Sequence, residues 1–275
     1  MTDSSDHYIK ANLAYWDQAV PTHVSSEFYD VAGWISAGSK PRPHEAALLG
    51  DLNGLELVQL QCHFGLDALA WAASGAKVVG VDFSPAAIAA ARRLAIEIGL
   101  DTRARFVLSD VRQAFASLEG EQFDVVYVSL GALCWIPRIE EWAKQVSLLL
   151  REGGRLFMHE IHPLALALDA TGRTFARGYF EDLEPAADDS SESYVGATPS
   201  GTTQVTYEWN HGLAEILSAL IGNQMRITHF EEHTWTSFAQ FEGFERKSSQ
   251  YFVPPAQWPA IPLSFTLMAQ KEPTN

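Results

Sequence analysis

Residues 55–84, LELVQLQCHFGLDALAWAASGAKVVGVDFS, decide the fold of this chain. Residues 57–61 and 77–82 are short apolar runs typical of buried strands, and residues 65–74 between them have helical periodicity. This order predicts two parallel strands with a helix packed against one face of their sheet. Asp82 ends the second strand, and Gly65 is the only glycine in the turn that follows the first.

The same alternation of strands and helices continues to about residue 162. Helical patterns cover residues 85–98 and 139–150, and strand patterns cover 105–109, 123–129 and 154–161. Ser84 and Pro85 mark the start of the first of these helices, and Gly99 marks its end. We therefore predict an α/β fold with a mostly parallel sheet, helices on both faces and a ligand at the carboxyl ends of the strands.

The segments on either side of this region have different patterns. Residues 7–35 are rich in aromatic side chains and predict two or three short helices, whereas residues 163–204 are acidic and turn-rich and predict a loop or lid. A helix near 211–222 follows, with strands near 225–231 and 262–269. We expect these last two strands to pair antiparallel at the sheet edge.

Composition limits the classes of protein and partner. The 275 residues, 47% hydrophobic and 19% charged, fit one globular domain with an insertion. No apolar run is long enough for a membrane span, and the start has no leader pattern, so we expect a cytoplasmic protein without a membrane partner. With 34 Asp and Glu against 19 Lys and Arg, repulsion opposes binding to nucleic acid. Two cysteines make neither a disulfide framework nor a four-cysteine zinc site.

Two acidic residues follow predicted strands at positions suited to an adenosine group. The carboxylate of Asp82 can accept hydrogen bonds from both hydroxyls of a ribose, and Asp110, after the third strand, can accept from an adenine amino group. Phe83 can pack on the adenine ring. For each residue the alternative is structural: a helix cap or surface acid for Asp82, a loop acid for Asp110 and a core position for Phe83.

Together these stretches resemble the class I S-adenosylmethionine-dependent methyltransferases, which have a Rossmann-like fold. The resemblance covers about residues 40–165 and rests on LVQLQCHFGLDALAWAASGAKVVGVDFSPAAIAAARR (57–93), FVLSDVRQ (106–113), FDVVYVSLGALCWI (123–136) and LLREGGRLFMHEIHP (149–163). It implies a seven-stranded, mostly parallel sheet. It also implies an N-terminal helical lid at residues 1–45 and a core at 46–275, with a lid or substrate insertion after strand 5 at about 163–210.

The first turn departs from the pattern of that family. Gln59, Gln61 and His63 stand where the family has an acidic residue and two glycines. The LQCHFG turn looks like a variant of bacterial small-molecule methyltransferases, in which Gln61 and His63 would contact the methionine part of the cofactor. The resemblance implies S-adenosyl-L-methionine as cofactor, S-adenosyl-L-homocysteine as product, and these cofactor-binding residues: Tyr15, Gln61, His63, Gly65, Asp82, Phe83, Asp110, Val111 and Ser129.

Candidate residues for the acceptor site lie outside these motifs. Strand alternation puts Glu160 and His162 on one side of the strand that ends at 161 and His159 on the other. We take Glu160, His162 and His211 as candidate general bases, and Tyr8, Tyr207 and Trp209 as substrate-binding walls. Glu160, His162, His159 and His211 could also ligate a metal, but such a short run more often serves capping and packing, so we expect no metal.

The leading hypothesis is an enzyme that moves the methyl group of S-adenosylmethionine to an N or O atom of a small molecule, in natural-product or antibiotic tailoring. A second hypothesis is a regulatory or non-catalytic module that binds S-adenosylmethionine or S-adenosylhomocysteine. A nucleotide-linked oxidoreductase is the third, although the chain lacks the G-x-G-x-x-G turn of dehydrogenases. The expected partner is a small-molecule acceptor; the sequence leaves oligomeric state open, a homo-oligomer included.

Overall fold

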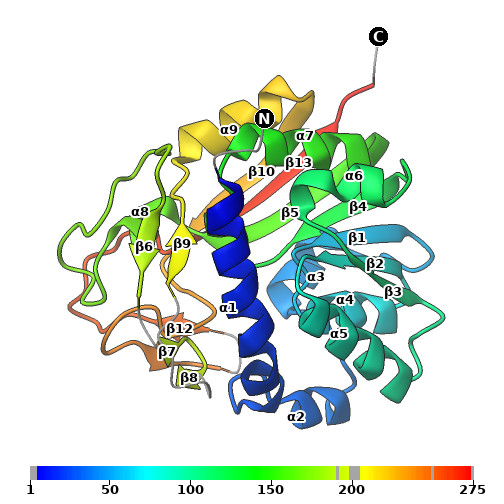
Figure 1. Cartoon of the computed structure of the whole chain (residues 1–275), viewed down its shortest axis with the longest axis horizontal. Coiled ribbons are helices and arrows are strands. Elements are labelled where there is room, and N and C mark those ends of the chain that lie inside the picture. The colour runs from blue at the N-terminus through cyan, green and yellow to red at the C-terminus, as the bar shows by residue number, and fades with distance from the viewer. Residues whose placement is uncertain (1–4, 190–191, 198–204, 249–250, 274–275) are drawn as a thin grey trace.

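The structure is a computed structural model that describes residues 5–189, 192–197, 205–248 and 251–273. Its centre is a seven-stranded sheet in the order β10-β13-β5-β4-β1-β2-β3 (Figure 1). Only β13 runs antiparallel to its neighbours, β5 and β10. The strands are β1 Glu56–Leu60, β2 Lys77–Asp82, β3 Ala104–Leu108, β4 Phe123–Val128, β5 Leu150–Ile161, β10 Met225–His233 and β13 Ser264–Lys271. The predicted α/β fold with a seven-stranded, mostly parallel sheet is confirmed.

Helices cover both faces of the sheet because its central strands are apolar on both sides. Val58 packs on the face covered by α6 (Ala114–Ser117), α7 (Ile139–Leu149) and α9 (Leu213–Gly222). Its neighbour Leu57 packs on the opposite face, covered by α3 (Pro43–Leu49), α4 (Leu66–Ala73) and α5 (Pro85–Glu97). Consecutive side chains of a strand point to opposite faces, so each strand supplies both cores.

The N-terminal segment differs from its prediction of two or three short helices. Residues Asp6–Ser25 form one 20-residue helix, α1, which continues through Pro21, and a short helix, α2 (Val31–Ser36), follows it. A buried side of α1 that includes Asn12, Ala19 and His23 explains its length, because this packing outweighs the hydrogen bond that Pro21 cannot make.

Two buried contacts hold α1 between the sheet domain and the inserted segment (Figure 1). The Asn12 amide exchanges two hydrogen bonds of 2.8 Å with the backbone of Tyr207 in β9 (Thr206–Glu208). On the other side, Asp17 Oδ1 accepts hydrogen bonds from Ser84 Oγ at 2.7 Å and Ala86 N at 2.8 Å, at the start of α5. Helix α1 therefore links the sheet domain to the insertion.

The segment predicted as a loop contains a short helix and small strands. Helix α8 (Pro163–Ala167) follows β5 directly, and β6 (Ala186–Asp188) pairs antiparallel with β9, while β7 (Glu192–Ser193) pairs with β8 (Gly196–Ala197). A further pair, β11 (Glu245–Arg246) and β12 (Phe252–Val253), lies in a segment where no strand was predicted. None of the helices in the described part of the chain combines the length and hydrophobicity that a membrane span requires.

Candidate functional site

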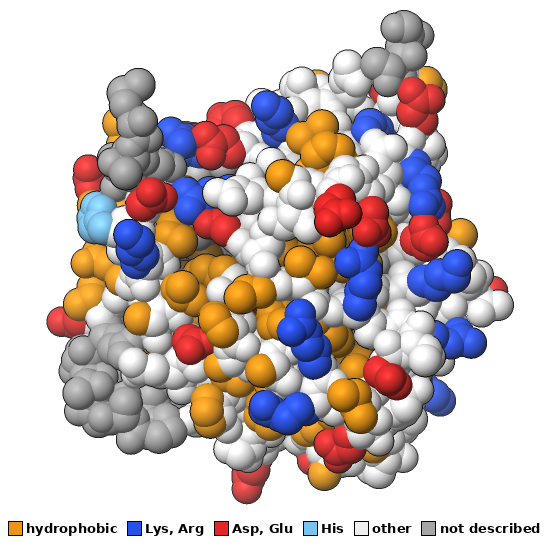
Figure 2. All heavy atoms as spheres, turned by 45° about the vertical axis from the view of Figure 1, so that its right-hand side comes forward, with side chains coloured by type: hydrophobic (Ala, Val, Ile, Leu, Met, Phe, Trp, Pro, Cys, Tyr) orange, Lys and Arg blue, Asp and Glu red, His pale blue; other side chains and the backbone are white. Residues whose placement is uncertain are grey.

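A cavity of about 1100 Å³ opens where β1, β2 and β4 end. Figure 2 shows one face of the molecule, where hydrophobic side chains gather near the middle and charges of both signs are interspersed around them. The cavity brings together all nine residues predicted to bind the cofactor: Tyr15, Gln61, His63, Gly65, Asp82, Phe83, Asp110, Val111 and Ser129. Residues from distant parts of the chain complete it, including Trp16, Trp135, Arg177 and Phe241.

The turn after β1 adopts glycine-like conformations without glycines. Gln61 and His63 have φ angles of 54° and 50°, in the left-handed region that costs a residue with a Cβ free energy. Hydrogen bonds hold the turn: Cys62 N donates to Val81 O at 2.9 Å, and Gln61 Nε2 donates to Ala132 O at 2.7 Å. Tertiary contacts therefore substitute for the missing glycines.

Gly65 is required for packing and backbone conformation rather than to make room for a ligand. Its φ is 83°, and an added Cβ would lie 2.6 Å from Phe106 Cε1 and 3.0 Å from Ala91 Cβ. These atoms belong to β3 and α5, which pack against the turn. Gly65 also lines the cavity, in a backbone conformation that residues with a Cβ rarely adopt.

Asp82 is buried at the cavity wall, and its carboxylate already accepts two backbone hydrogen bonds. The donors are His63 N at 2.7 Å and Ser84 N at 2.9 Å. Burial raises the pKa of this carboxyl to about 6, although these hydrogen bonds oppose the shift. Each carboxylate oxygen keeps a second lone pair, so Asp82 can accept further donors from the cavity.

Two amide oxygens in the cavity wall lack hydrogen-bond donors. Gln59 Nε2 donates to Ser129 Oγ at 3.0 Å, and Gln61 Nε2 donates to Ala132 O. The Oε1 atom of each side chain is buried and has no partner among the described residues. Buried acceptors in this state favour a bound group with N–H donors. Gln59 was not among the residues predicted to bind the cofactor.

Asp110, the residue predicted to bind adenine, also lines the cavity, where its carboxylate is paired with an arginine. The guanidinium of Arg112 binds the Asp110 carboxylate, with Nη2 at 2.7 Å and Nε at 3.0 Å from Oδ2. This pair fixes the carboxylate beside Phe83 and Val111.

A pair of neutral imidazoles lies behind the first turn. His63 Nε2 is 2.9 Å from His23 Nδ1, and His23 Nε2 is 2.8 Å from Ser193 Oγ. Burial lowers the pKa of His63 to about 3, with a contribution from His23, and burial lowers the pKa of His23 to about 4. The ring of Trp16 contacts His63 edge-on at 5.4 Å and Trp135 at 5.2 Å. The wall here is aromatic and uncharged at neutral pH.

The three candidate bases do not line the cavity. The carboxylate of Glu160 is buried and accepts hydrogen bonds from four backbone N–H groups, those of Gly131, Ala132, Leu133 and Ile161 at 2.5 to 3.0 Å. His162 caps α8 by accepting from Leu164 N at 3.0 Å, and its Nε2 lies 2.9 Å from Glu232 Oε1. The prediction that Glu160 or His162 is a general base is therefore corrected, because their acceptor atoms are used in the fold.

His211, the third candidate, is also committed to the fold. Its Nε2 lies 2.9 Å from Ile136 O and 3.2 Å from Leu133 O, and its Nδ1 lies 2.8 Å from a Glu181 carboxylate oxygen. These contacts tie the segment after β4 to the insertion. A general base needs a free nitrogen facing the reacting group, so we also correct this prediction.

The predicted substrate walls Tyr8, Tyr207 and Trp209 instead pack on one another. The ring of Tyr8 lies 4.6 Å from that of Tyr207 and 6.0 Å from that of Trp209, between centroids, and its hydroxyl hydrogen-bonds Glu184. None of the three lines the cavity. Their rings pack α1 against β9. The prediction that they form a substrate-binding wall is therefore corrected. Aromatic residues at the cavity come instead from other segments: Trp16, Trp135, Phe238 and Phe241.

Known proteins resemble this chain in sequence and in fold. A family model described as a methyltransferase domain matches residues 58–156. The ubiquinone biosynthesis O-methyltransferase of Stutzerimonas stutzeri (strain A1501) is 30% identical over 126 residues, which are 45% of this chain and 53% of that protein. The protein of the same name from Methylobacterium sp. (strain 4-46) is 30% identical over 166 residues, 59% of this chain and 61% of that protein. The chain thus spans between half and two thirds of these relatives.

One solved structure extends the likeness beyond the sheet core. The crystal structure of an S-adenosylmethionine-dependent methyltransferase from Mesorhizobium loti is 25% identical, with a TM-score of 0.60, and the match covers 83% of this chain and 96% of that one. The similarity to this structure supports the fold built on the seven-stranded sheet. The methyltransferase-domain match over residues 58–156 and the similarity to this structure support a class I S-adenosylmethionine-dependent methyltransferase.

Proposed function

We propose that this chain binds S-adenosylmethionine in the cavity and transfers its methyl group to an oxygen or nitrogen atom of a small molecule. One observation carries the proposal. Asp82 and the two buried, partnerless amide oxygens of Gln59 and Gln61 line a single cavity at the carboxyl ends of the parallel strands. These acceptor atoms match a ligand that brings its own hydroxyl and ammonium donors.

The residues present fit the three parts of the cofactor. Asp82 would accept the ribose hydroxyls, and Asp110, held by Arg112, would accept the adenine amino group beside Phe83 and Val111. The Oε1 atoms of Gln59 and Gln61 would accept the methionine ammonium. When bound, the cofactor supplies a methyl group activated by a sulfonium cation.

The protein's part in such a transfer is positioning and exclusion of water. Trp16 and Trp135 give the cavity an apolar wall. Because the pKa values of His63 and His23 are lowered to about 3 and 4, both rings are uncharged at neutral pH. No imidazolium there would repel a cationic methyl donor.

Oxygen as the acceptor atom has support from relatives that are named O-methyltransferases. A hydroxyl acceptor must lose a proton, and Asp188 and Glu208 are carboxylates that line the cavity, the latter paired with Arg177 at 2.5 Å. We propose these carboxylates as proton acceptors in place of Glu160, His162 and His211. A role in natural-product or antibiotic tailoring remains part of this proposal.

The lid assignment is likewise a proposal. Asn12 and Asp17 connect α1 to the insertion and to α5, so residues 1–45 and the insertion at 163–210 would cover the cavity as one unit. Of these segments, residues 1–4, 190–191 and 198–204 lie outside the described residues.

Radiolabelled methyl transfer from S-adenosylmethionine to a panel of phenols and amines tests the function. We expect labelled methyl groups in at least one phenolic or amine product, with release of one S-adenosylhomocysteine per methyl group, and less label with Asp82→Ala at subsaturating S-adenosylmethionine. Tight binding of S-adenosylhomocysteine without turnover on any acceptor would support the non-catalytic module instead. Reduction of a nicotinamide cofactor would support the oxidoreductase.

A further inference from the structure

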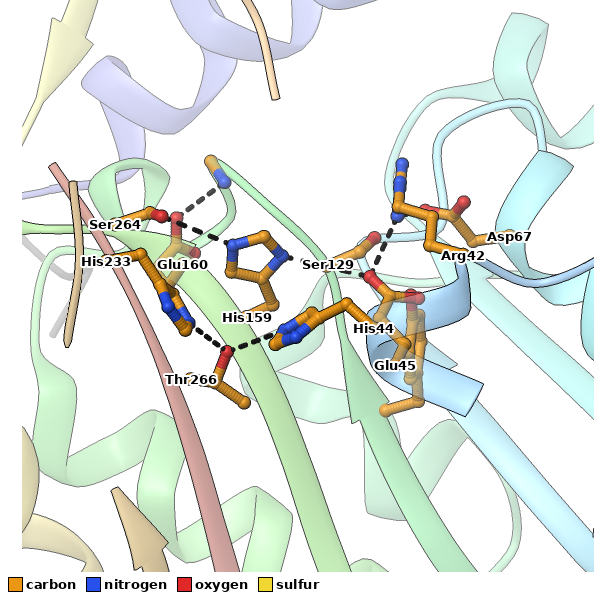
Figure 3. A network of polar contacts seen from close by, with 12 residues as sticks. Arg42, His44, Glu45, Asp67, Ser129, His159, Glu160, His233, Ser264 and Thr266 are labelled. Carbon is orange, nitrogen blue, oxygen red and sulfur yellow. Dashed lines mark hydrogen bonds and ion pairs between the residues drawn. The ribbon is translucent and has the colours of Figure 1, made fainter. Parts of the chain in front are cut away.

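A cluster of three histidines lies apart from the residues that line the cavity. His44 is in α3, His159 in β5 and His233 at the end of β10, and their potential ligand atoms all lie within 4.8 Å of one another. Figure 3 shows the three rings turned toward one another, with Thr266 of β13 between His44 and His233. No other group of three such ligands occurs among the residues that the structure describes.

The spacing of the rings matches that of imidazoles around one metal ion. The ring centroids are 5.2 Å apart for His44 and His233, 5.3 Å for His44 and His159, and 5.8 Å for His159 and His233. With metal–nitrogen distances of about 2.0–2.1 Å in a tetrahedral site, coordinated imidazole rings have centres roughly 5 Å apart. The rings therefore need rotation more than translation to coordinate an ion.

The hydrogen bonds of the cluster are incomplete. His159 Nδ1 is buried without a hydrogen-bond partner, 3.8 Å from Glu45 Oε1. The Nε2 atoms of His44 and His233 both contact the single hydroxyl of Thr266, at 2.9 and 2.8 Å. The hydroxyl can donate to one of these rings and accept an N–H from the other, so the unpartnered atom of the cluster is His159 Nδ1. Metal coordination would give that nitrogen a partner.

Charge and access also suit a divalent cation. The carboxylate of Glu45 lies 3.8 Å from His159 Nδ1 and is also paired with Arg42 Nη1 at 3.0 Å. Glu231 Oε1 lies 3.9 Å from His233 Nδ1 and adds a second negative charge. His159 and His233 are buried, whereas His44 is partly exposed and gives a route of entry.

We propose that His44, His159 and His233 form a binding site for one divalent transition-metal ion such as Zn²⁺. The site is structural, because its ligands join α3 to two strands of the antiparallel sheet edge and none of them lines the cavity. This replaces the expectation of no metal from the sequence, and the site differs from the set His159, Glu160, His162 and His211 considered there. Only His159 is shared, since it lies on the opposite face of β5 from Glu160.

Metal titration of the chelator-treated full-length chain tests the site. We expect one Zn²⁺ per chain by equilibrium dialysis, a rise in the unfolding midpoint with Zn²⁺, and visible absorption bands of nitrogen-ligated Co²⁺. His44→Gln and His159→Gln should each weaken Zn²⁺ binding at least about tenfold, the scale seen even for outer-shell groups. The His44→Gln variant should retain its fold more readily than His159→Gln, because His44 is partly exposed.

His229→Gln is the matched control, since His229 is on β10 but outside the cluster. It should bind Zn²⁺ as the unaltered chain does. Absence of one-to-one binding at micromolar Zn²⁺ would overturn the proposal. So would binding that the His44 and His159 substitutions leave unchanged, or that His229→Gln weakens as much as they do. Circular dichroism of each variant excludes loss of the fold as the cause.

Discussion

Replacing Asp82 with alanine is expected to weaken binding of S-adenosylhomocysteine about 30-fold or more. This corresponds to about 2 kcal/mol, the scale of charge-assisted hydrogen bonds lost from a ribose. The Asp82 carboxylate is the acceptor group at the end of β2 and lines the cavity. Calorimetric titration of the variant measures the change.

Asp101→Ala is the control, because Asp101 is exposed and outside the cavity lining. It should bind with unchanged affinity. Since Asp82 also accepts hydrogen bonds from His63 N and Ser84 N, thermal unfolding of Asp82→Ala must show a folded protein. Unchanged affinity in a folded Asp82→Ala variant would remove Asp82 from the site.

The raised pKa of Asp82 adds a pH dependence to the same interaction. With a pKa of about 6, most Asp82 carboxyls are protonated at pH 5 in the free protein. If the ionised form binds the ribose, affinity for S-adenosylhomocysteine should fall about tenfold from pH 7 to pH 5. The pH dependence of stability has the opposite sign. Because ionising this buried carboxyl is unfavourable, the free energy of unfolding of the unliganded protein should fall as pH rises from about 4 to 6. Asp82→Asn should abolish the pH dependence that this group contributes to binding.

Replacing Glu160 with glutamine is expected to destabilise the fold strongly. It should not act by removing a general base from the methyl-transfer reaction. The four backbone N–H groups around the carboxylate belong to the segment after β4, which lines the cavity, and to Ile161. The side-chain NH2 group of a glutamine would face some of these backbone N–H groups, which need an acceptor. We expect the free energy of unfolding to fall by about 3 kcal/mol or more.

Chemical denaturation of Glu160→Gln and Glu140→Gln measures this. Glu140 is exposed on α7, so its substitution should change stability by less than about 0.5 kcal/mol. A general base would behave differently, since its removal lowers single-turnover rates about 10²- to 10⁴-fold without unfolding the protein. A stable Glu160→Gln variant with such a rate loss would restore Glu160 as the base.

The sequence predicted the parallel core well because strand and helix periodicities are local. The Ser84–Pro85 start of α5 and the Asp82 position at the end of β2 both follow from neighbouring residues. Since parallel strands end at one edge of the sheet, residues after β1, β2 and β3 had to meet there. This is why the predicted cofactor residues that follow these strands line one cavity, which Ser129 reaches from the end of β4 and Tyr15 from α1.

The acceptor side could not be predicted in the same way. Position at a strand end suggested a catalytic role for Glu160, but its partners are backbone groups of the segment after β4, whose path no side-chain pattern reveals. Phe238 and Phe241 reach the cavity from a segment without periodicity. The cluster of His44, His159 and His233 depends on the antiparallel pairing of β10, β13 and β5 and on the place of α3. Contacts between distant segments decided each of these features.

Calorimetry of the unaltered chain with S-adenosylhomocysteine, S-adenosylmethionine and NAD⁺ tests the central claim most directly. The predicted result is one site per chain for the first two ligands, with competition between them, and no heat of binding with NAD⁺. Absence of binding by both S-adenosyl ligands at millimolar concentration, or saturable binding of NAD⁺ in their place, would contradict the assignment of the cavity.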